Sequence, residues 1–185
     1  MSLKGKKVAI LATNGFEQSE LEVPRDRLKA AGLQVDIVSP ESGEITGWNK
    51  KDWGTAVKVD VPLDKASAND YDAIVLPGGQ INPDLLRVNQ KALNFIRAFY
   101  DQKKVVAAAC HAPWLLIETG IIEGRKATSY KSIKTDMTNA GAKWEDSEVV
   151  TDQGIVTSRN PGDLEAFSRK IMEEIEEGKH TQRAA

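Results

Sequence analysis

The sequence predicts an α/β fold built on a mostly parallel sheet with helices on both faces. The first observation is that short, continuous apolar runs recur along the chain, at residues 7–13, 71–79 and 103–110. The second is that each run ends in a turn, and the third is that helical sequence follows each turn. Strands that are apolar throughout are buried on both faces, which is typical of a parallel sheet covered by helices on both sides.

The first third of the chain predicts a βαβ unit followed by an excursion from the sheet. Residues 7–13 are rich in apolar and β-branched side chains, which favours a buried strand. Apolar residues then recur at helical spacing up to Gly32, and residues 33–40 alternate between apolar and polar before a proline. Residues 43–63 have β character interrupted by glycines, so we expect a small β-hairpin there.

The remaining elements complete one domain over residues 1–178. Further strands are expected at 71–79 and 103–110, and amphipathic helices at 88–102, 131–140 and 162–177. Residues 179–185 are expected to form a flexible tail. Because ligands of open parallel sheets bind at the carboxyl ends of the strands, three turns are candidates for the site. These turns are residues 13–20, 77–84 and 109–113.

The composition favours an ordinary globular protein. The 185 residues include 25 Lys and Arg against 27 Asp and Glu, for a formal net charge of -2. This balance predicts neither sequence-specific nucleic acid nor a membrane surface as partner. No secretory signal is recognisable, and no apolar run approaches the roughly 18 residues that cross a bilayer. We therefore expect a cytoplasmic protein.

The segment VVAAACHAPWLL (105–116) holds the single cysteine of the chain, Cys110. Ala108 and Ala112 lie two positions before and after it, and small residues are required there when a strand reverses sharply into a helix around a nucleophile. Free N–H groups and the helix dipole at such a turn are expected to lower the pKa of a thiol. The alternative is a small buried residue, since unpaired cysteine is among the most buried types.

His111 is the expected partner of the thiol. A histidine next to a cysteine can act as its general base, although adjacent residues face one another only on irregular backbone. The second histidine, His180, falls in the expected tail. One cysteine and two distant histidines do not supply a structural zinc site, so we expect no metal.

The chain resembles the PfpI-type intracellular proteases and their glyoxalase and protein deglycase relatives, in the class I glutamine amidotransferase-like superfamily. The resemblance rests on LPGGQINPDLLR, AAACHAPWLLIETG, GRKATSYKSIKTDMTNAGA and the NGFEQSE turn, and runs from about Lys7 to Ile175. It implies a flavodoxin-like three-layer sandwich, a nucleophilic Cys110 at an elbow with His111 beside it, and an acid near the thiol carried by Glu17.

Glu17 leaves the first strand at the sheet edge where Cys110 is also expected. A desolvated carboxyl group there would have a raised pKa and could move a proton to or from sulfur. The structural alternative is an acid at the start of a helix, with Ser19 and Glu22 as a rival capping box.

The turn LPGGQINPD supplies two further candidates. The N–H groups of Gly78 and Gly79, together with that of His111, are expected to form an oxyanion hole, although a plain turn would also explain the glycines. The resemblance makes Asp84 a candidate to orient the histidine across a subunit contact. Asn82, Pro83 and Asp84 also fit the N-cap, first position and early acid of a helix.

The expected function is a cysteine enzyme that acts on reactive carbonyls without a cofactor, as a glyoxalase or deglycase does. An intracellular cysteine peptidase using the same Cys-His site is the alternative, because a nucleophile beside an oxyanion hole serves both reactions. A redox-responsive chaperone or binding protein, with Cys110 oxidised to sulfinic acid, is the alternative from another class. Expected partners are small carbonyls, peptides or glycated proteins.

The glutamate-rich first turn and the segment 158–167 exclude two other classes. Glu17, Glu20 and Glu22 disfavour a flavin or nucleotide phosphate, and residues 158–167 lack the histidine and acid of a glutamine amidotransferase triad.

The assembly is expected to be a homodimer or larger. Trp48 and Trp53 on the hairpin are candidates for a subunit contact. Tyr130 and Arg159 are candidates for the pocket lining.

Overall fold

A seven-stranded sheet forms the centre of the computed structural model, which describes residues 2–181. Its strand order is β10-β11-β7-β6-β1-β2-β5, and all neighbours are parallel except β10 and β11. The strands are β1 (Lys7–Leu11), β2 (Gln34–Ser39), β5 (Val61–Pro62), β6 (Ala73–Leu76), β7 (Val105–Ala109), β10 (Val149–Asp152) and β11 (Ile155–Ser158). The expected α/β fold with a flavodoxin-like, mostly parallel sheet is confirmed.

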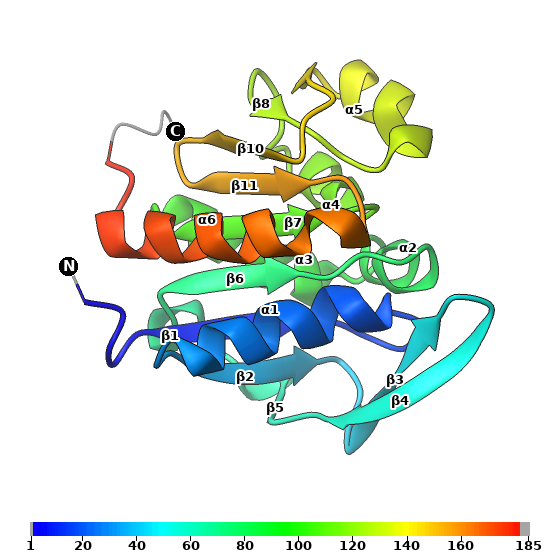
Figure 1. Ribbon diagram of the computed structural model, residues 1–185, viewed down its shortest axis with the longest axis vertical. Helices are drawn as coiled ribbons and strands as arrows, with labels where there is room; N and C mark the ends of the chain where they lie inside the picture. Colours follow the sequence, from blue (N-terminus) through cyan, green and yellow to red (C-terminus); the bar gives the residue numbers. More distant parts are fainter. Residues whose placement is uncertain (1, 182–185) are drawn as a thin grey trace.

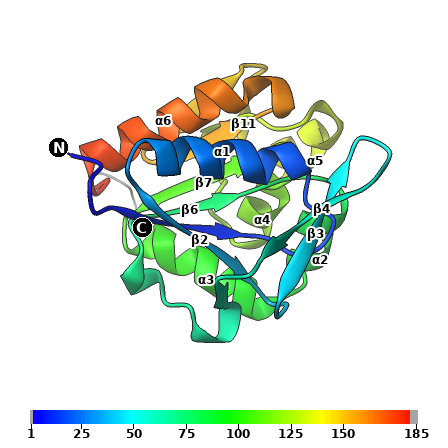
Figure 2. The same cartoon turned by 60° about the horizontal axis from the view of Figure 1, so that its bottom comes forward.

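Helices cover both faces of this sheet, as Figures 1 and 2 show. On one face α1 and α6 lie side by side, and α3 and α4 cover the other face. The helices are α1 (Gln18–Ala30), α2 (Ile81–Leu86), α3 (Gln90–Asp101), α4 (Pro113–Glu118), α5 (Lys134–Asn139) and α6 (Leu164–Glu177). Short 3-10 turns occur at η1 (Leu63–Lys65), η2 (Ala68–Asp70), η3 (Lys131–Ile133) and η4 (Pro161–Asp163).

Alternation along the central strands divides the core into two layers. On β1, Val8 and Ile10 pack with α1 and α6, whereas Ala9 and Leu11 pack with the other layer. Strands β6 and β7 alternate in the same way, and every residue of the three strands except Lys7 is buried. Burial on both faces is therefore why these segments are apolar throughout.

Two small sheets lie outside the main one. The expected hairpin is formed by β3 (Glu44–Asn49) and β4 (Asp52–Lys58), after which β5 returns to the edge of the main sheet. Backbone hydrogen bonds from Gly15 to Thr46 and from Trp48 to Phe16 attach the hairpin to the turn after β1. A parallel pair, β8 (Lys126–Ala127) and β9 (Lys143–Trp144), was not expected from the sequence.

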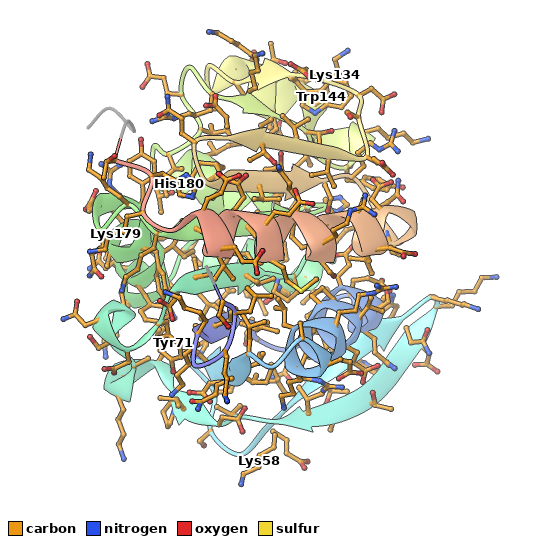
Figure 3. The ribbon with its side chains drawn as sticks, turned by 60° about the vertical axis from the view of Figure 1, so that its left-hand side comes forward. Lys58, Tyr71, Lys134, Trp144, Lys179 and His180 are labelled. Atoms are coloured by element: carbon orange, nitrogen blue, oxygen red, sulfur yellow. The ribbon has the colours of Figure 1, made fainter. Side chains whose placement is uncertain are left out.

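The start of the expected tail is packed against the domain. The His180 N–H donates to the Lys103 carbonyl at 3.0 Å, and the His180 side chain lies beside Glu174 of α6 (Figure 3). Residues 179–181 of the expected tail thus contact the domain, and their flexibility stays a prediction. Residues 182–185 of that tail lie outside the described part of the chain.

No helix within residues 2–181 has the length and apolar character needed to cross a bilayer. The carboxyl ends of β1, β6, β7 and β11 lie at one edge of the sheet, beside α2 and the hairpin (Figure 1). The three turns expected to build the site meet at this edge.

Candidate active site

Cys110 lies at a strained elbow between β7 and α4. Its φ is +60°, which is unusual for a residue other than glycine and costs on the order of 1–3 kcal/mol. Two backbone hydrogen bonds hold this conformation: its N–H donates to Ser158 at 3.0 Å, and its carbonyl accepts from Tyr130 at 2.8 Å. Ala108 and Ala112 are fully buried beside the turn. The elbow expected from the small flanking residues is therefore present.

The Cys110 side chain lies at the base of a cavity of about 400 Å³. Only 6 % of the residue is exposed, and it packs with the same core layer as α1 and α6. The cavity walls come from the turns after β1, β6 and β7, with Trp48 and Lys50 from the hairpin. Cys110 is thus mostly buried but lines a cavity that a small molecule can enter. It has features of both alternatives from the sequence, a nucleophile at an elbow and a small buried residue.

The acid that contacts the thiol is Glu20, not Glu17. Glu20 is fully buried beside Cys110 and acts on the pKa of its thiol; its Oε2 accepts the Gly78 N–H at 2.7 Å, and its Oε1 has no hydrogen-bond partner among the described residues. Glu17 is the N-cap residue of α1 and lines the cavity, but its Oε1 accepts a hydrogen bond from Ser19 at 3.2 Å. Its expected contact with sulfur is wrong by one helical turn, and the rival capping box of Ser19 and Glu22 is also absent at this helix start.

Burial governs the protonation of Glu20 and Cys110. It raises the pKa of Glu20 to about 8, the nearby charge of Glu17 acts in the same direction, and the Gly78 N–H opposes the shift. Burial likewise raises the pKa of the Cys110 thiol, as does the charge of the nearby Glu20 carboxyl group. This direction is opposite to the expected lowering of the thiol pKa by the helix dipole, because burial favours the neutral thiol. The thiol needs a base in order to ionise.

His111 is in position to be that base. Its Nδ1 lies 3.2 Å from the Cys110 sulfur, a contact that the irregular elbow makes possible between adjacent residues. Burial lowers the pKa of His111, which keeps the ring neutral at physiological pH and leaves one nitrogen able to accept a proton. The ring stacks on Tyr130 with centroids 4.8 Å apart, and Trp114 meets it edge-on at 5.3 Å.

Two backbone N–H groups face the sulfur. Those of Gly79 and His111 favour the charged form of Cys110 and so oppose the effect of burial on its pKa; they stay candidates for the expected oxyanion hole. Gly79 has a φ of +83°, a conformation that glycine adopts without strain. The Gly78 N–H is instead used by Glu20, so Gly78 does not supply the expected third donor. Its role is close packing, because a Cβ there would lie 2.7 Å from the Cβ of Cys110.

Asn82 differs from the helix-start interpretation, whereas Asp84 is an acid in the first turn of α2, as that interpretation has it. Helix α2 begins at Ile81, and the Asn82 side chain is fully buried inside the turn. Its Oδ1 accepts the Thr13 N–H at 2.8 Å and its Nδ2 donates to the Pro77 carbonyl at 2.8 Å, so Asn82 ties the first turn to the second. Asp84 is exposed on α2 and does not line the cavity within one chain.

Tyr130 lines the cavity as expected, whereas Arg159 does not. Asp163 and Asp146 hold the Arg159 guanidinium at 3.0 and 2.9 Å. It borders a neighbouring hollow of about 390 Å³, which Tyr130 separates from the first.

Sequence reasoning missed Glu20 and Ser132. Glu20 shares the buried face of α1 with Leu21, Pro24 and Leu28, and a charged residue in phase with an apolar stripe was the available signal. Ser132 Oγ lies 3.2 Å from His111 Nε2, and no feature of its local sequence pointed to that contact.

One group of possible metal ligands lies away from the elbow. Glu174 and Glu177 in the last turn of α6 and His180 beyond it each bring a ligand atom within 4.8 Å of the others. Lys170 lies 3.4 Å from Glu174 and already provides a positive charge there. In the part of the chain that the structure describes, no group of this kind includes Cys110.

Comparison with known proteins agrees with this geometry. The model of the DJ-1/PfpI family matches residues 6–174. A deglycase of Pyrococcus horikoshii is 46 % identical over 166 residues, covering 90 % of this chain and 97 % of the relative. The protein/nucleic acid deglycase 2 of Escherichia coli is 40 % identical over 168 residues, covering 90 % and 96 %.

A solved structure supports the fold. A two-domain protein of Anabaena variabilis, with DJ-1/ThiJ/PfpI-like and ferritin-like domains, superposes with a TM-score of 0.87 at 37 % identity. The match covers 92 % of this chain and 50 % of that one.

Proposed function

Because the chain belongs to the DJ-1/PfpI family, we propose that it is a cofactor-independent cysteine enzyme of the glyoxalase and deglycase type. One observation carries the proposal. The sulfur of Cys110 lies 3.2 Å from His111 Nδ1, and the buried Glu20 carboxyl group and the N–H groups of Gly79 and His111 are close enough to act on the pKa of the thiol. A nucleophile, proton carriers and oxyanion donors are therefore present around one atom.

The reaction with a 2-oxoaldehyde begins with addition of sulfur to the aldehyde carbon. The thiol proton passes to His111 Nδ1 while the S–C bond forms, and the new oxyanion lies near the N–H groups of Gly79 and His111 before it takes a proton. The aldehyde carbon then loses its hydrogen as a proton to the Glu20 carboxylate, and a proton is returned to the adjacent carbon. The product is a thioester of a 2-hydroxy acid.

Water then attacks the thioester carbonyl. The S–C bond breaks, the 2-hydroxy acid leaves and sulfur regains its proton, so the sum is aldehyde plus water giving hydroxy acid without an external oxidant. An adduct of the same aldehyde on an amine enters the sequence with release of that amine, which takes a proton. The substrate proposed is thus a free 2-oxoaldehyde or its adduct on a protein.

A direct assay tests this function. Purified protein is incubated with methylglyoxal, with a methylglyoxal-modified peptide and with casein, and 2-hydroxy acid, free amine and peptide fragments are measured. We expect hydroxy acid from the first two substrates and its loss in Cys110→Ala. Cleavage of casein without hydroxy acid would replace the proposal with the peptidase alternative. Peroxide oxidation of Cys110 without turnover of any substrate would favour the redox-responsive binding protein.

We also propose that the chain forms a homo-oligomer through the surface beside the cavity. Leu85 and Val88 at α2 and Trp53 on the hairpin are exposed by 50 %, 83 % and 53 %, and Figure 2 shows α2 and the hairpin on the same side of the molecule. Large apolar side chains exposed together are typical of subunit contacts. Asp84 lies on this surface, which keeps its proposed action across a subunit contact. Sedimentation of a monomer at micromolar concentration would contradict the assembly.

A further inference from the structure

The Nε2 atom of His111 has a partner within its own chain. Ser132 Oγ lies 3.2 Å from it, and Ser132 belongs to η3. The contact is made, inside one subunit, at the ring nitrogen for which Asp84 of a second subunit is the other candidate partner, so the two residues are alternatives for orienting the histidine.

The segment that carries Ser132 is attached to the elbow at several points. The Tyr130 N–H donates to the Cys110 carbonyl at 2.8 Å, and the Tyr130 ring stacks on the imidazole. Ile133, the next residue after Ser132, is 98 % buried and anchors η3 in the core layer of α3 and α4. These contacts hold the backbone on either side of Ser132, whose own side chain lies at the exposed edge of the ring.

A neutral imidazole carries its proton on one nitrogen only, and the two arrangements differ in function. With the proton on Nε2, the ring donates to Ser132 Oγ and its Nδ1 lone pair faces the sulfur. With the proton on Nδ1, the ring has no lone pair toward the thiol and is not its base. Which nitrogen is protonated is set by the hydrogen bond at the other nitrogen.

We propose that Ser132 is a positioning residue that accepts the Nε2–H of His111 and so holds Nδ1 ready to take the proton of Cys110. The inference rests on the proposed function for its catalytic consequence. After proton transfer the imidazolium keeps the same hydrogen bond, so the ring does not turn during the reaction. Because serine carries no charge, it stabilises the imidazolium less than a carboxylate would. The imidazolium therefore gives its proton back more easily.

The surroundings leave Ser132 as the polar contact of this nitrogen among the described residues. Burial is the cause of the lowered pKa of His111, and no neighbouring charge adds to it. Several titratable and charged groups surround the ring. Cys110 lies at the elbow, and Tyr130 and Lys131 flank Ser132 in the sequence. Glu17, Glu20 and Lys50 line the cavity, whereas Asp136 and Arg87 contact the Trp114 ring.

The test compares Ser132→Ala, Ser132→Thr and, as a control, Thr138→Ala, which removes an exposed hydroxyl of α5 that bonds only to the Lys134 carbonyl. The tautomer of His111 is read by nitrogen NMR without substrate, and kcat and KM for methylglyoxal are measured against pH. We expect the Nε2–H form in the native protein and in Ser132→Thr, and a mixture in Ser132→Ala with kcat reduced about tenfold at unchanged KM. Thr138→Ala is expected to match the native protein.

Two outcomes would overturn the inference. One is an Nδ1–H tautomer in the native protein. The other is a Ser132→Ala variant with native tautomer and pH profile while Asp84→Asn changes both, which would assign the orienting role to the second subunit. Failure of the native protein to convert methylglyoxal would reject the proposed function, and the NMR result would still decide the role of Ser132.

Discussion

The fully buried Glu20 carboxyl group, in the first turn of α1, lies beside Cys110, which directly follows β7 and is 6 % exposed. The two groups exchange the same proton, because Glu20 protonated beside a thiolate carries the same total charge as ionised Glu20 beside a thiol. Burial favours the fully protonated pair, since it raises the pKa of both. We therefore expect activity to depend on Glu20 as a proton carrier.

Glu20→Gln tests that dependence. The amide keeps the shape and stays neutral but cannot release a proton, so turnover of carbonyl substrates should fall by about 10²-fold or more. The negative charge that raises the pKa of Cys110 is also removed, so thiolate absorbance should appear at lower pH in the variant. Glu17→Gln is the comparison, and a smaller loss is expected because Glu17 does not contact the sulfur. An equal or larger loss in Glu17→Gln would return the acid role to Glu17.

The same pair should make stability depend on pH. Glu20 has a folded pKa of about 8 against 4.5 for the unfolded chain, so the folded protein binds more protons between these values. Its contribution to stability is then fully present below pH 4.5 and is lost as pH rises toward 8, by at most roughly 5 kcal/mol. Urea unfolding of native protein and Glu20→Gln should show curves of stability against pH that converge at low pH and separate above pH 5. Parallel curves would contradict the raised pKa.

The central strands and the elbow were predictable because local sequence determines them. β1, β6 and β7 are apolar on both faces, and the alanines around Cys110 are the small residues that a sharp turn needs. The β10–β11 hairpin was not predicted, because its strands have four residues each and its turn at Gln153-Gly154 has positive φ at a residue that rarely adopts it.

From the sequence, the acid beside the thiol was assigned to Glu17 and not to Glu20, because the choice depends on the residue at which α1 begins. Glu17 and Glu20 are one turn apart, and only the start of α1 at Gln18 shows which of them points into the core. The buried Gly78 N–H also donates a hydrogen bond to Glu20, and these two residues are 58 positions apart in the sequence. Such contacts depend on how the turns of β1 and β6 meet at the sheet edge, which local patterns do not specify.

Backbone strain at Cys110 predicts an order of stability between two inactive variants. Both Cys110→Gly and Cys110→Ala remove the nucleophile and the sulfur contacts, but only glycine adopts a φ of +60° without strain. Cys110→Gly should therefore be more stable than Cys110→Ala by about 1 kcal/mol in urea unfolding. The reverse order would mean that the elbow relaxes to negative φ once the sulfur is absent.

Close packing at Gly78 predicts that one added methyl group will disrupt the site. A Cβ at this position would lie 2.5 Å from Glu20 Oε2, 2.7 Å from the Ala109 carbonyl and 2.7 Å from the Cys110 Cβ. Gly78→Ala should lose about 1–3 kcal/mol of stability and most of its activity, since the turn must move away from both the acid and the nucleophile. Gly162→Ala is the matched control, because the added Cβ meets only Asn160 Oδ1, at 3.0 Å. Native kcat and unfolding midpoint in Gly78→Ala would show that the turn after β6 and the elbow are not in the contact described.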